Sequence, residues 1–246
     1  MNYTLNPIFA NDFKNFTLKI RDFFNKNAET IHKARNELKI IESHNISTVV
    51  KSFKKPNLFN RIVYSFFRDS KAKKSYQYSL KIKDFVPKPI SYIEFYEDNL
   101  LNDSYFISEQ FVYDFTIREP LLDKNFKDRK EILQAFARFT LELHDNGIFH
   151  KDYSPGNILI KIENEHYTFK IVDINRMSFF ELSEEDRAKN FSKLWASEEA
   201  LTTIATEYKN NFTCTDDFIN KTLHYSLQNK KIKNFKKWLK GKEIDW

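Results

Sequence analysis

Two short stretches of the sequence hold the residue types that chemistry on a phosphate group requires. His150, Asp152 and Asn157 form an H-x-D-x-x-x-x-N pattern, and Asp173 ends an apolar run further along the chain. Phosphoryl transfer from ATP needs one carboxylate that orients the acceptor hydroxyl and takes its proton, together with oxygen ligands for Mg²⁺. Asp152 can supply the first function, and Asn157 with Asp173 the second. The two stretches together predict a site for phosphoryl transfer.

The segments around these stretches predict the elements that position them. Apolar runs at 157–161 and 169–173 favour a pair of strands, which would bring Asn157 and Asp173 close together despite their separation in sequence. An amphipathic helix is predicted just before them, and Gly147 stands where such a helix would end. Its apolar face consists of Ile132, Phe136, Phe139 and Leu143, which recur at helical spacing.

The N-terminal part of the chain predicts a small unit that is rich in strands and carries one important helix. Runs of β-branched and aromatic residues between turn residues favour strands at 30–34, 38–42, 46–53, 90–96 and 105–112. Helical spacing favours helices at 11–25 and 59–85. After Pro120 the pattern becomes mostly helical. The predicted fold class is therefore α+β, with a β-rich N-terminal part and a helical C-terminal part.

The composition excludes several classes of site. The chain has three glycines, so neither G-x-G-x-x-G nor a Walker A loop can be present. The single Cys214 excludes internal disulfides and cysteine-rich zinc sites, which fits a reducing cytosol. The net charge of +6 fits an anionic partner such as a nucleotide or an anionic membrane surface. We expect no nucleic-acid partner, since the sequence has no aromatic RNA-binding strand, zinc finger or arginine-rich patch.

Neither a signal peptide nor a membrane-spanning run is visible in the sequence. The N-terminus lacks a charged region followed by a long apolar run, and no apolar stretch approaches the ~20 residues that cross a bilayer. We therefore expect a cytoplasmic protein. The run 229–242 holds seven lysines around Ile232, Phe235 and Leu239. This run predicts either a terminal helix docked on its neighbours with a solvated basic side, or peripheral attachment to anionic lipid on the inner face of the inner membrane.

Taken together, the motifs resemble those of lipopolysaccharide core kinases of the Kdo/WaaP type, one branch of the protein-kinase-like fold. Three segments carry the resemblance, namely 49–56 (VVKSFKKP), 150–159 (HKDYSPGNIL) and 172–177 (VDINRM), where an ordinary protein kinase has D-F-G. The resemblance covers about residues 28–210. It implies one kinase-like domain over 1–246, with an N-lobe at about 1–110 and a C-lobe at 111–246.

The resemblance also implies a role for each catalytic residue. Lys51 would be the strand lysine that reaches the α- and β-phosphates of ATP, and Asp152 the catalytic base. Asn157 and Asp173 would be the Mg²⁺ ligands. We expect His150 to be a buried anchor of the catalytic loop rather than a proton shuttle.

The nucleotide side of the implied site departs from the family. The hairpin around Arg35 and Asn36 would cover the phosphates, yet it has no glycine. The residues from Glu109 to Val112 would form the hinge that holds adenine. Gln77 stands where the family commonly has a glutamate that pairs with the strand lysine. An amide can still accept a hydrogen bond from the lysine, but it forms no charge-assisted pair.

The resemblance implies an ATP- and Mg²⁺-dependent kinase that phosphorylates Kdo or heptose in the lipopolysaccharide inner core. No A-P-E motif follows Asp173, which favours a sugar or small-molecule hydroxyl over a protein as acceptor. Two alternatives stay open. One is a kinase of a soluble alcohol such as choline or an aminoglycoside. The other, motivated by Gln77 and the hairpin without glycine, is a catalytically weak nucleotide-binding module.

Overall fold

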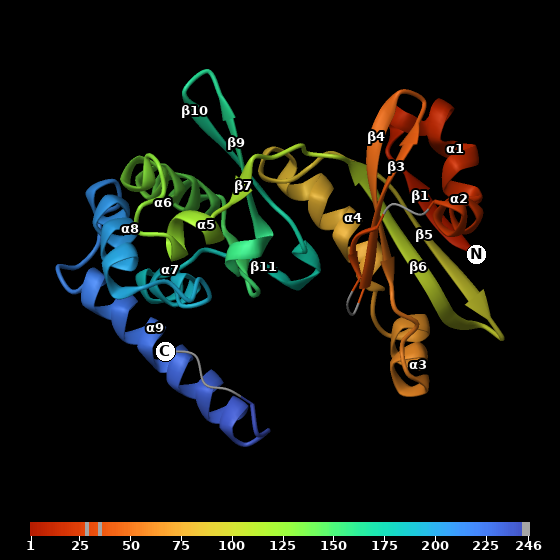
Figure 1. Ribbon diagram of the computed structural model, residues 1–246. Helices are drawn as coiled ribbons and strands as arrows, with labels where there is room; N and C mark the ends of the chain where they lie inside the picture. Colours follow the sequence, from red (N-terminus) through yellow and green to blue (C-terminus); the bar gives the residue numbers. More distant parts are fainter. Residues whose placement is uncertain (28–29, 34–35, 243–246) are drawn as a thin grey trace. The chain divides into compact units, whose positions relative to one another are not determined.

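Alternating apolar residues in the N-terminal part of the chain form an antiparallel sheet. The computed structural model describes residues 1–27, 30–33 and 36–242 and contains two compact units, Met1–Val112 and Tyr113–Trp246 (Figure 1). The sheet of the first unit has the order β1-β5-β6-β4-β3-β2. Its strands are β1 (Asn2–Leu5), β2 (Thr30–Lys33), β3 (Asn36–Ser43), β4 (Ile46–Phe53), β5 (Pro89–Glu97) and β6 (Leu100–Glu109). The predicted strands are present, although the one predicted over 105–112 spans Leu100–Glu109 and position 34 of the first lies outside the described residues. Strand β1 was not predicted.

Helices cover both faces of this sheet. They are α1 (Ala10–Leu18), α2 (Ile20–Lys26), α3 (Leu58–Phe66) and α4 (Lys71–Ile82). On one face, Phe13 and Phe16 of α1 pack with Val50 of the sheet in the main apolar core. On the other face, Tyr76 of α4 packs with Phe53 in a smaller core.

Both helices predicted in this unit are interrupted. The helix predicted over 11–25 divides at Lys19 into α1 and α2. The helix predicted over 59–85 ends at Phe66 and restarts at Lys71. Ser70 caps the restart, since its hydroxyl accepts the backbone N–H of Lys73 at 3.1 Å. Helical spacing alone does not reveal such a break inside one amphipathic stretch.

The second unit combines helices with two small antiparallel sheets of order β10-β9-β7 and β11-β8. Its strands are β7 (Phe115–Thr116), β8 (Ile148–His150), β9 (Ile158–Glu163), β10 (His166–Ile171) and β11 (Met177–Phe179). Its α-helices are α5 (Arg118–Leu122), α6 (Arg129–Asp145), α7 (Glu184–Phe191), α8 (Glu198–Asn210) and α9 (Phe218–Trp238). Two turns of 3-10 helix, η3 (Pro155–Asn157) and η4 (Ile174–Arg176), lie beside the β8–β11 pair.

The helix before the predicted catalytic loop ends as the sequence indicates. Ile132, Phe136 and Leu143 of α6 are buried, and Gly147 follows the helix with a left-handed φ of +68°. A Cβ on Gly147 would lie 2.9 Å from the backbone oxygen of Phe180. Glycine is therefore required here both for its conformation and for the close approach of the next strand.

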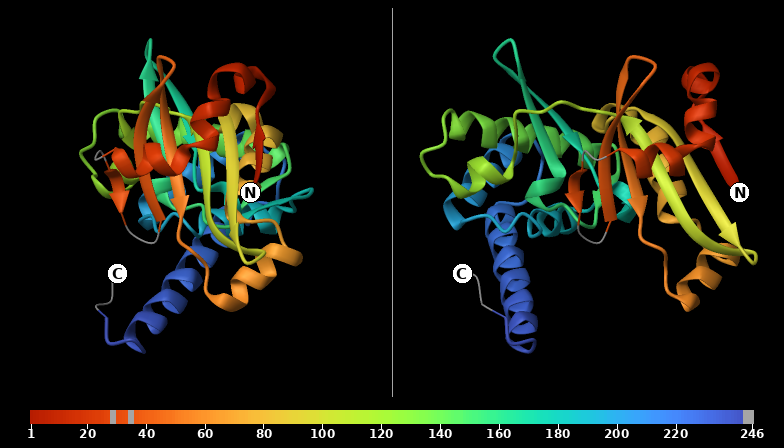
Figure 2. Two further views of the ribbon diagram at one scale, coloured as in Figure 1. Left: turned by 90° about the vertical axis from the view of Figure 1, so that its right-hand side faces the viewer. Right: turned by 45° about the vertical axis from the view of Figure 1, so that its right-hand side comes forward.

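The long terminal helix α9 lies partly on the rest of the second unit and partly beyond it. Phe218, Thr222 and Ser226 of its first half are buried, and the last turns of the helix extend away from α7 and α8 (Figure 2). Trp238 and Leu239 at its end are exposed. No helix among the described residues is long and apolar enough to cross a membrane. The predicted α+β class, with a β-rich part and a helical part, is confirmed.

Candidate active site

Strand pairing in the second unit joins the two sequence stretches that carry the predicted chemistry. In the β8–β11 ladder His150 pairs with Met177. Just beyond this pair, the backbone N–H of Lys151 donates to the backbone carbonyl of Arg176 at 2.9 Å. In the β9–β10 ladder Ile158 pairs with Ile171. The loop 151–157 and the segment 172–176 therefore run side by side, as the predicted strand pair requires.

A closed ring of four hydrogen bonds fixes the loop. The backbone N–H of Asp152 donates to Nδ1 of His150 at 3.1 Å, and Nε2 of His150 lies 3.2 Å from the carbonyl oxygen of Val172. The backbone N–H of Val172 donates to the carbonyl of Asn157 at 2.9 Å, and Nδ2 of Asn157 donates to the carbonyl of Asp152 at 3.0 Å. The predicted base and one predicted metal ligand are thus held on one frame.

His150 serves this ring as a neutral imidazole. Its side chain is fully buried, and burial lowers its pKa from the ordinary value. Because a backbone N–H can only donate, Nδ1 must accept, and the ring proton lies on Nε2, which donates to Val172. The arrangement makes His150 a positioning residue for Asp152.

Asn157 and Asp173 offer the oxygen atoms that Mg²⁺ prefers. The amide nitrogen of Asn157 points to Asp152, so its Oδ1 is the end that can bind a cation. Asp173 follows Val172 with a left-handed φ of 56°, and Oδ1 of Asp173 accepts a hydrogen bond from Asn175 at 2.7 Å. No group of three or more His, Cys, Asp or Glu side chains able to hold a metal occurs in the part of the chain that the structure describes. One carboxylate and one amide suit Mg²⁺ that also binds substrate phosphates and water.

Positive charge surrounds the carboxylate of Asp152. A guanidinium nitrogen of Arg176 lies 3.6 Å from Oδ2 of Asp152, and the two side chains are 63% and 43% exposed. Lys233 of α9 is also within electrostatic range of Asp152. Burial lowers the pKa of Lys233, Lys193 lowers it further, and Asp152 raises it. The ammonium of Lys233 lies 5.0 Å from the ring centre of Trp195. The sequence motifs gave no indication that α9 supplies a cation near the predicted base.

A buried polar network that the sequence analysis missed holds β8 against α7 and α8. Nδ2 of Asn190 donates to the carbonyl of His150 at 2.9 Å, and Oδ1 of Asn190 lies 3.0 Å from Nε2 of His144. Nδ1 of His144 lies 2.9 Å from the hydroxyl of Tyr208, which also accepts from Arg187 at 2.9 Å. Burial lowers the pKa of His144 to about 4, so this histidine is neutral as well. Asn190 and Tyr208 lie far from the motif in the sequence, and nothing in the sequence pattern predicts their contacts with His150 and His144.

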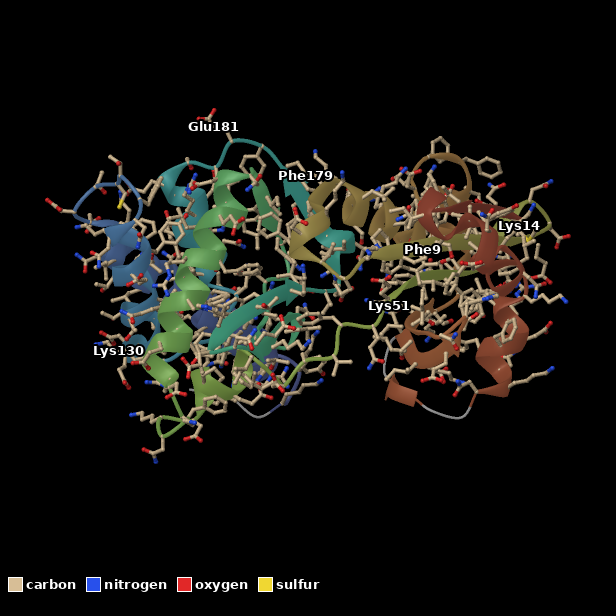
Figure 3. All side chains as sticks on the ribbon, turned by 90° about the horizontal axis from the view of Figure 1, so that it is seen from above. Phe9, Lys14, Lys51, Lys130, Phe179 and Glu181 are labelled. Carbon is tan, nitrogen blue, oxygen red and sulfur yellow. The ribbon has the colours of Figure 1, made fainter. Side chains whose placement is uncertain are left out.

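Lys51 lies in the first unit, on β4 between β3 and β6 (Figure 3). Alternation along the strand places it on the same face as Phe53, which is the face that α4 covers. Its ammonium lies 5.3 Å from the ring centre of Phe53. Lys51 is partly buried, as expected for a lysine on the sheet face that α4 covers.

The other residues predicted to contact nucleotide also lie in the first unit. Arg35 lies outside the described residues. Asn36 begins β3 opposite Phe53, and Gln77 is exposed on α4 beside the buried Tyr76. Glu109 ends β6, where its backbone N–H donates to the backbone carbonyl of Lys88 at 2.9 Å. Val112 is 64% exposed and is the last residue of the unit. The roles of these residues stay predictions.

Comparison of the structure with solved structures identifies the class of fold. The structure is similar to that of "WaaP in complex with acyl carrier protein", with a TM-score of 0.59 and 12% identity over 93% of this chain and 99% of that chain. "Calcium-dependent protein kinase 4" of Plasmodium falciparum (isolate 3D7) is 30% identical over 99 residues, or 39% of this chain. The match spans 18% of the length of that relative. The fold is therefore that of WaaP.

The family match is more specific. Residues 116–216, which contain the predicted base and both predicted metal ligands, match the model of the lipopolysaccharide kinase (Kdo/WaaP) family. The predicted resemblance to this family is thereby confirmed, and the match contains two of the three motifs, 150–159 and 172–177, whereas 49–56 lies outside it. This is a family of kinases, and the predicted enzyme class, a phosphotransferase that acts on an alcohol group, agrees with the match.

Proposed function

We propose that the protein is an ATP- and Mg²⁺-dependent kinase that phosphorylates a sugar hydroxyl, Kdo or heptose, of the lipopolysaccharide inner core. The observation that supports it most is the ring of hydrogen bonds through His150, Asp152, Asn157 and Val172. This ring joins the backbone of Asp152 to the side chain of Asn157, which supports the proposal that Asp152 acts on the acceptor and Asn157 binds Mg²⁺. Rigid positioning of such groups supplies most of the catalysis in phosphoryl transfer.

In this proposal Asp152 accepts a hydrogen bond from the acceptor hydroxyl and takes its proton as the new O–P bond forms. The bond between the γ-phosphorus and the β,γ-bridging oxygen of ATP breaks in the same step, and ADP leaves with that oxygen. The guanidinium of Arg176, 3.6 Å from the same carboxylate, would help to orient it. The neutral His150 holds the backbone of the loop through Nδ1. Since protonation of His150 would remove this acceptor, its burial contributes directly to the geometry of the base.

Asn157 and Asp173 would hold Mg²⁺, which neutralises charge on the phosphates when it is bound. Lys51 would bind the α- and β-phosphates, with Gln77 as its hydrogen-bond partner. Arg35 and Asn36 would cover the phosphates, and the segment from Glu109 to Val112 would hold adenine. We propose in the same way that the two compact units act as the N-lobe and the C-lobe of one kinase-like domain.

The charges near the base fit the acceptor that the family suggests. Arg176 and Lys233 interact with Asp152, and Lys193 with Lys233. These cations suit a sugar that carries carboxylate or phosphate groups, and Kdo is a sugar acid. We further propose that α9, with its lysines and the exposed Trp238 and Leu239, attaches the enzyme to the inner face of the inner membrane. WaaP was solved in complex with acyl carrier protein, which makes that protein a second partner to test.

The decisive experiment measures transfer of the γ-phosphoryl group from Mg·ATP to purified core lipopolysaccharide. We expect phosphate on the sugar with the wild type, and none above background with Asp152→Asn or Asp173→Asn. Transfer to a soluble alcohol instead of the lipopolysaccharide would retain the kinase and reject the proposed acceptor. Saturable nucleotide binding without transfer to any acceptor would favour the catalytically weak module.

A further inference from the structure

Helix α3 is amphipathic, but it turns its apolar side outward. Its nine residues are all described, and none of them is buried. Leu58 and Phe66 are 63% and 64% exposed, and Phe59 and the following Phe67 are 73% and 78% exposed. Ile62, on the same side of the helix, is 40% exposed. Soluble proteins rarely expose a contiguous cluster of large apolar side chains that serves no contact.

The opposite, polar side of α3 attaches the helix to the sheet. Nε of Arg61 donates to the carbonyl of Leu101 at 2.9 Å, and the backbone N–H of Leu101 donates to the hydroxyl of Ser65 at 2.8 Å. Arg61 also lies 3.9 Å from a carboxylate oxygen of Glu97. These bonds to the end of the β5–β6 hairpin fix the rotation of the helix. The exposed apolar side is therefore a built feature of the fold, and α3 extends beyond the end of the sheet near that hairpin (Figures 1 and 2).

Positive charge flanks the apolar side of α3. Residues 54–74 contain seven Lys and Arg residues and one acidic residue, Asp69. A pocket of about 270 Å³ lies beside the start of α3. Its polar lining includes Lys54, Lys55, Lys71, Asn57, Asn60 and Tyr64. The ammonium of Lys55 also donates to Glu97 at 3.2 Å, and together with Lys54 and Lys71 it leaves an excess of positive charge around the pocket. This excess suits a ligand that carries a phosphate group.

We propose that α3 and the lysine-lined pocket beside it form a docking site for an anionic lipid surface. Phe59, Phe66 and Phe67 would enter the interfacial region of the bilayer, and the pocket would take the phosphate of a lipid headgroup. Large apolar residues on one side of a short helix, with lysines around them, have the composition of an interfacial anchor. A flat lipid surface fits the convex face of a helix without a matching groove. The surrounding charge selects an anionic membrane over a neutral one.

This inference goes beyond the proposed kinase activity and does not depend on it. The proposed attachment through α9 uses residues of the second unit, whereas α3 belongs to the first unit. The two attachments are therefore separable by substitution, and lipid binding is measured without ATP or acceptor.

The test is co-sedimentation of the full chain with vesicles of phosphatidylcholine alone or mixed with phosphatidylglycerol. We expect the wild type to bind the mixed vesicles, and the double substitution Phe59→Ser with Phe67→Ser to weaken binding at least tenfold. Lys54→Gln with Lys71→Gln should weaken it by about fivefold for each lysine. The matched control changes Leu122→Ser, an exposed leucine of α5, and should bind as the wild type does.

Thermal unfolding of each variant separates lost binding from lost folding. The inference is overturned if the folded double phenylalanine variant binds vesicles like the wild type, since α9 would then account for the attachment. It is also overturned if the wild type binds neutral and anionic vesicles equally. Capture of an acidic protein through α3, with no binding to vesicles, would assign this surface to a protein partner instead.

Discussion

The loop 151–157, between β8 and β9, and the surroundings of Lys51 hold their predicted site residues by different means. In the loop, bonds between residues distant in sequence fix the backbone of Asp152 and Asn157, and His150 is fully buried behind them. Lys51 is placed by the alternation of one strand, and Gln77 is exposed on a helix. The first region lies within the part of the chain that matches the kinase family model, whereas Gln77, at the position where the resemblance implies a glutamate, carries no charge. We therefore expect substitutions in the two regions to have unequal effects.

The largest effect is expected at the predicted base. Asp152→Asn keeps the shape of the side chain but cannot take a proton, so we expect transfer to lipopolysaccharide to fall by about 10²–10⁴-fold. The side chain is 43% exposed, and its backbone contacts remain, so thermal stability should change little. A rate assay with a parallel melting curve measures both. The control Asp216→Asn, at an exposed carboxylate, should leave the rate unchanged. Wild-type activity in Asp152→Asn would remove Asp152 from the chemistry.

Acidification should affect the buried histidine network next. The pKa of His144 is lowered to about 4, and that of His150 is also lowered, both chiefly by burial. The unfolded chain, with histidine pKa values of about 6.5, then binds more protons below that pH. The stabilisation is complete above pH 6.5 and is lost as the pH falls towards 4, at a cost of about 3 kcal/mol for His144 alone.

Urea unfolding at a series of pH values measures this loss. His144→Gln retains a polar side chain at this position but does not titrate, so it should flatten the dependence between pH 6.5 and 4. The same slope in wild type and His144→Gln would show that other groups cause the loss of stability.

A smaller effect is expected where the chain enters β8. Gly147→Ala adds a methyl group 2.9 Å from the backbone oxygen of Phe180 at a φ of +68°, and should cost about 2 kcal/mol of unfolding free energy. Gly241→Ala is a matched control, because its φ is +62° but no atom lies within 4 Å of the added Cβ. Equal losses in the two variants would mean that conformation alone, and not the contact with Phe180, makes glycine necessary.

The strands and the loop of the candidate site could be predicted from the sequence, whereas the contacts that support them could not. The H-x-D-x-x-x-x-N pattern and the apolar strands after it have local signatures, so the loop and the pairing of strands 157–161 and 169–173 could be predicted, although not their register. Asn190 of α7 binds the carbonyl of His150, and Tyr208 of α8 contacts His144. Single polar contacts of this kind leave no periodic pattern in the sequence, so they could not be predicted. The spacing at 59–85 predicted one helix and said nothing of which side of α3 is exposed. The polar bonds of Arg61 and Ser65 fix that orientation, and they are visible only in three dimensions.

The smallest effect is expected at Gln77, and it tests the difference between the loop 151–157 and the surroundings of Lys51 most directly. Gln77→Glu restores the charge that the family commonly has on this helix, and on the proposed function it would form a charge-assisted bond with Lys51. We expect the KM for Mg·ATP to fall up to tenfold, equivalent to about 1.4 kcal/mol, with little change in stability because Gln77 is exposed. Gln228→Glu adds the same charge on an exposed part of α9 and should not change the KM. An unchanged KM in Gln77→Glu would show that Lys51 does not depend on this position. Lys51 would then bind nucleotide without a charged partner at position 77. The two regions would differ in how their residues are held, but not in how much they contribute to activity.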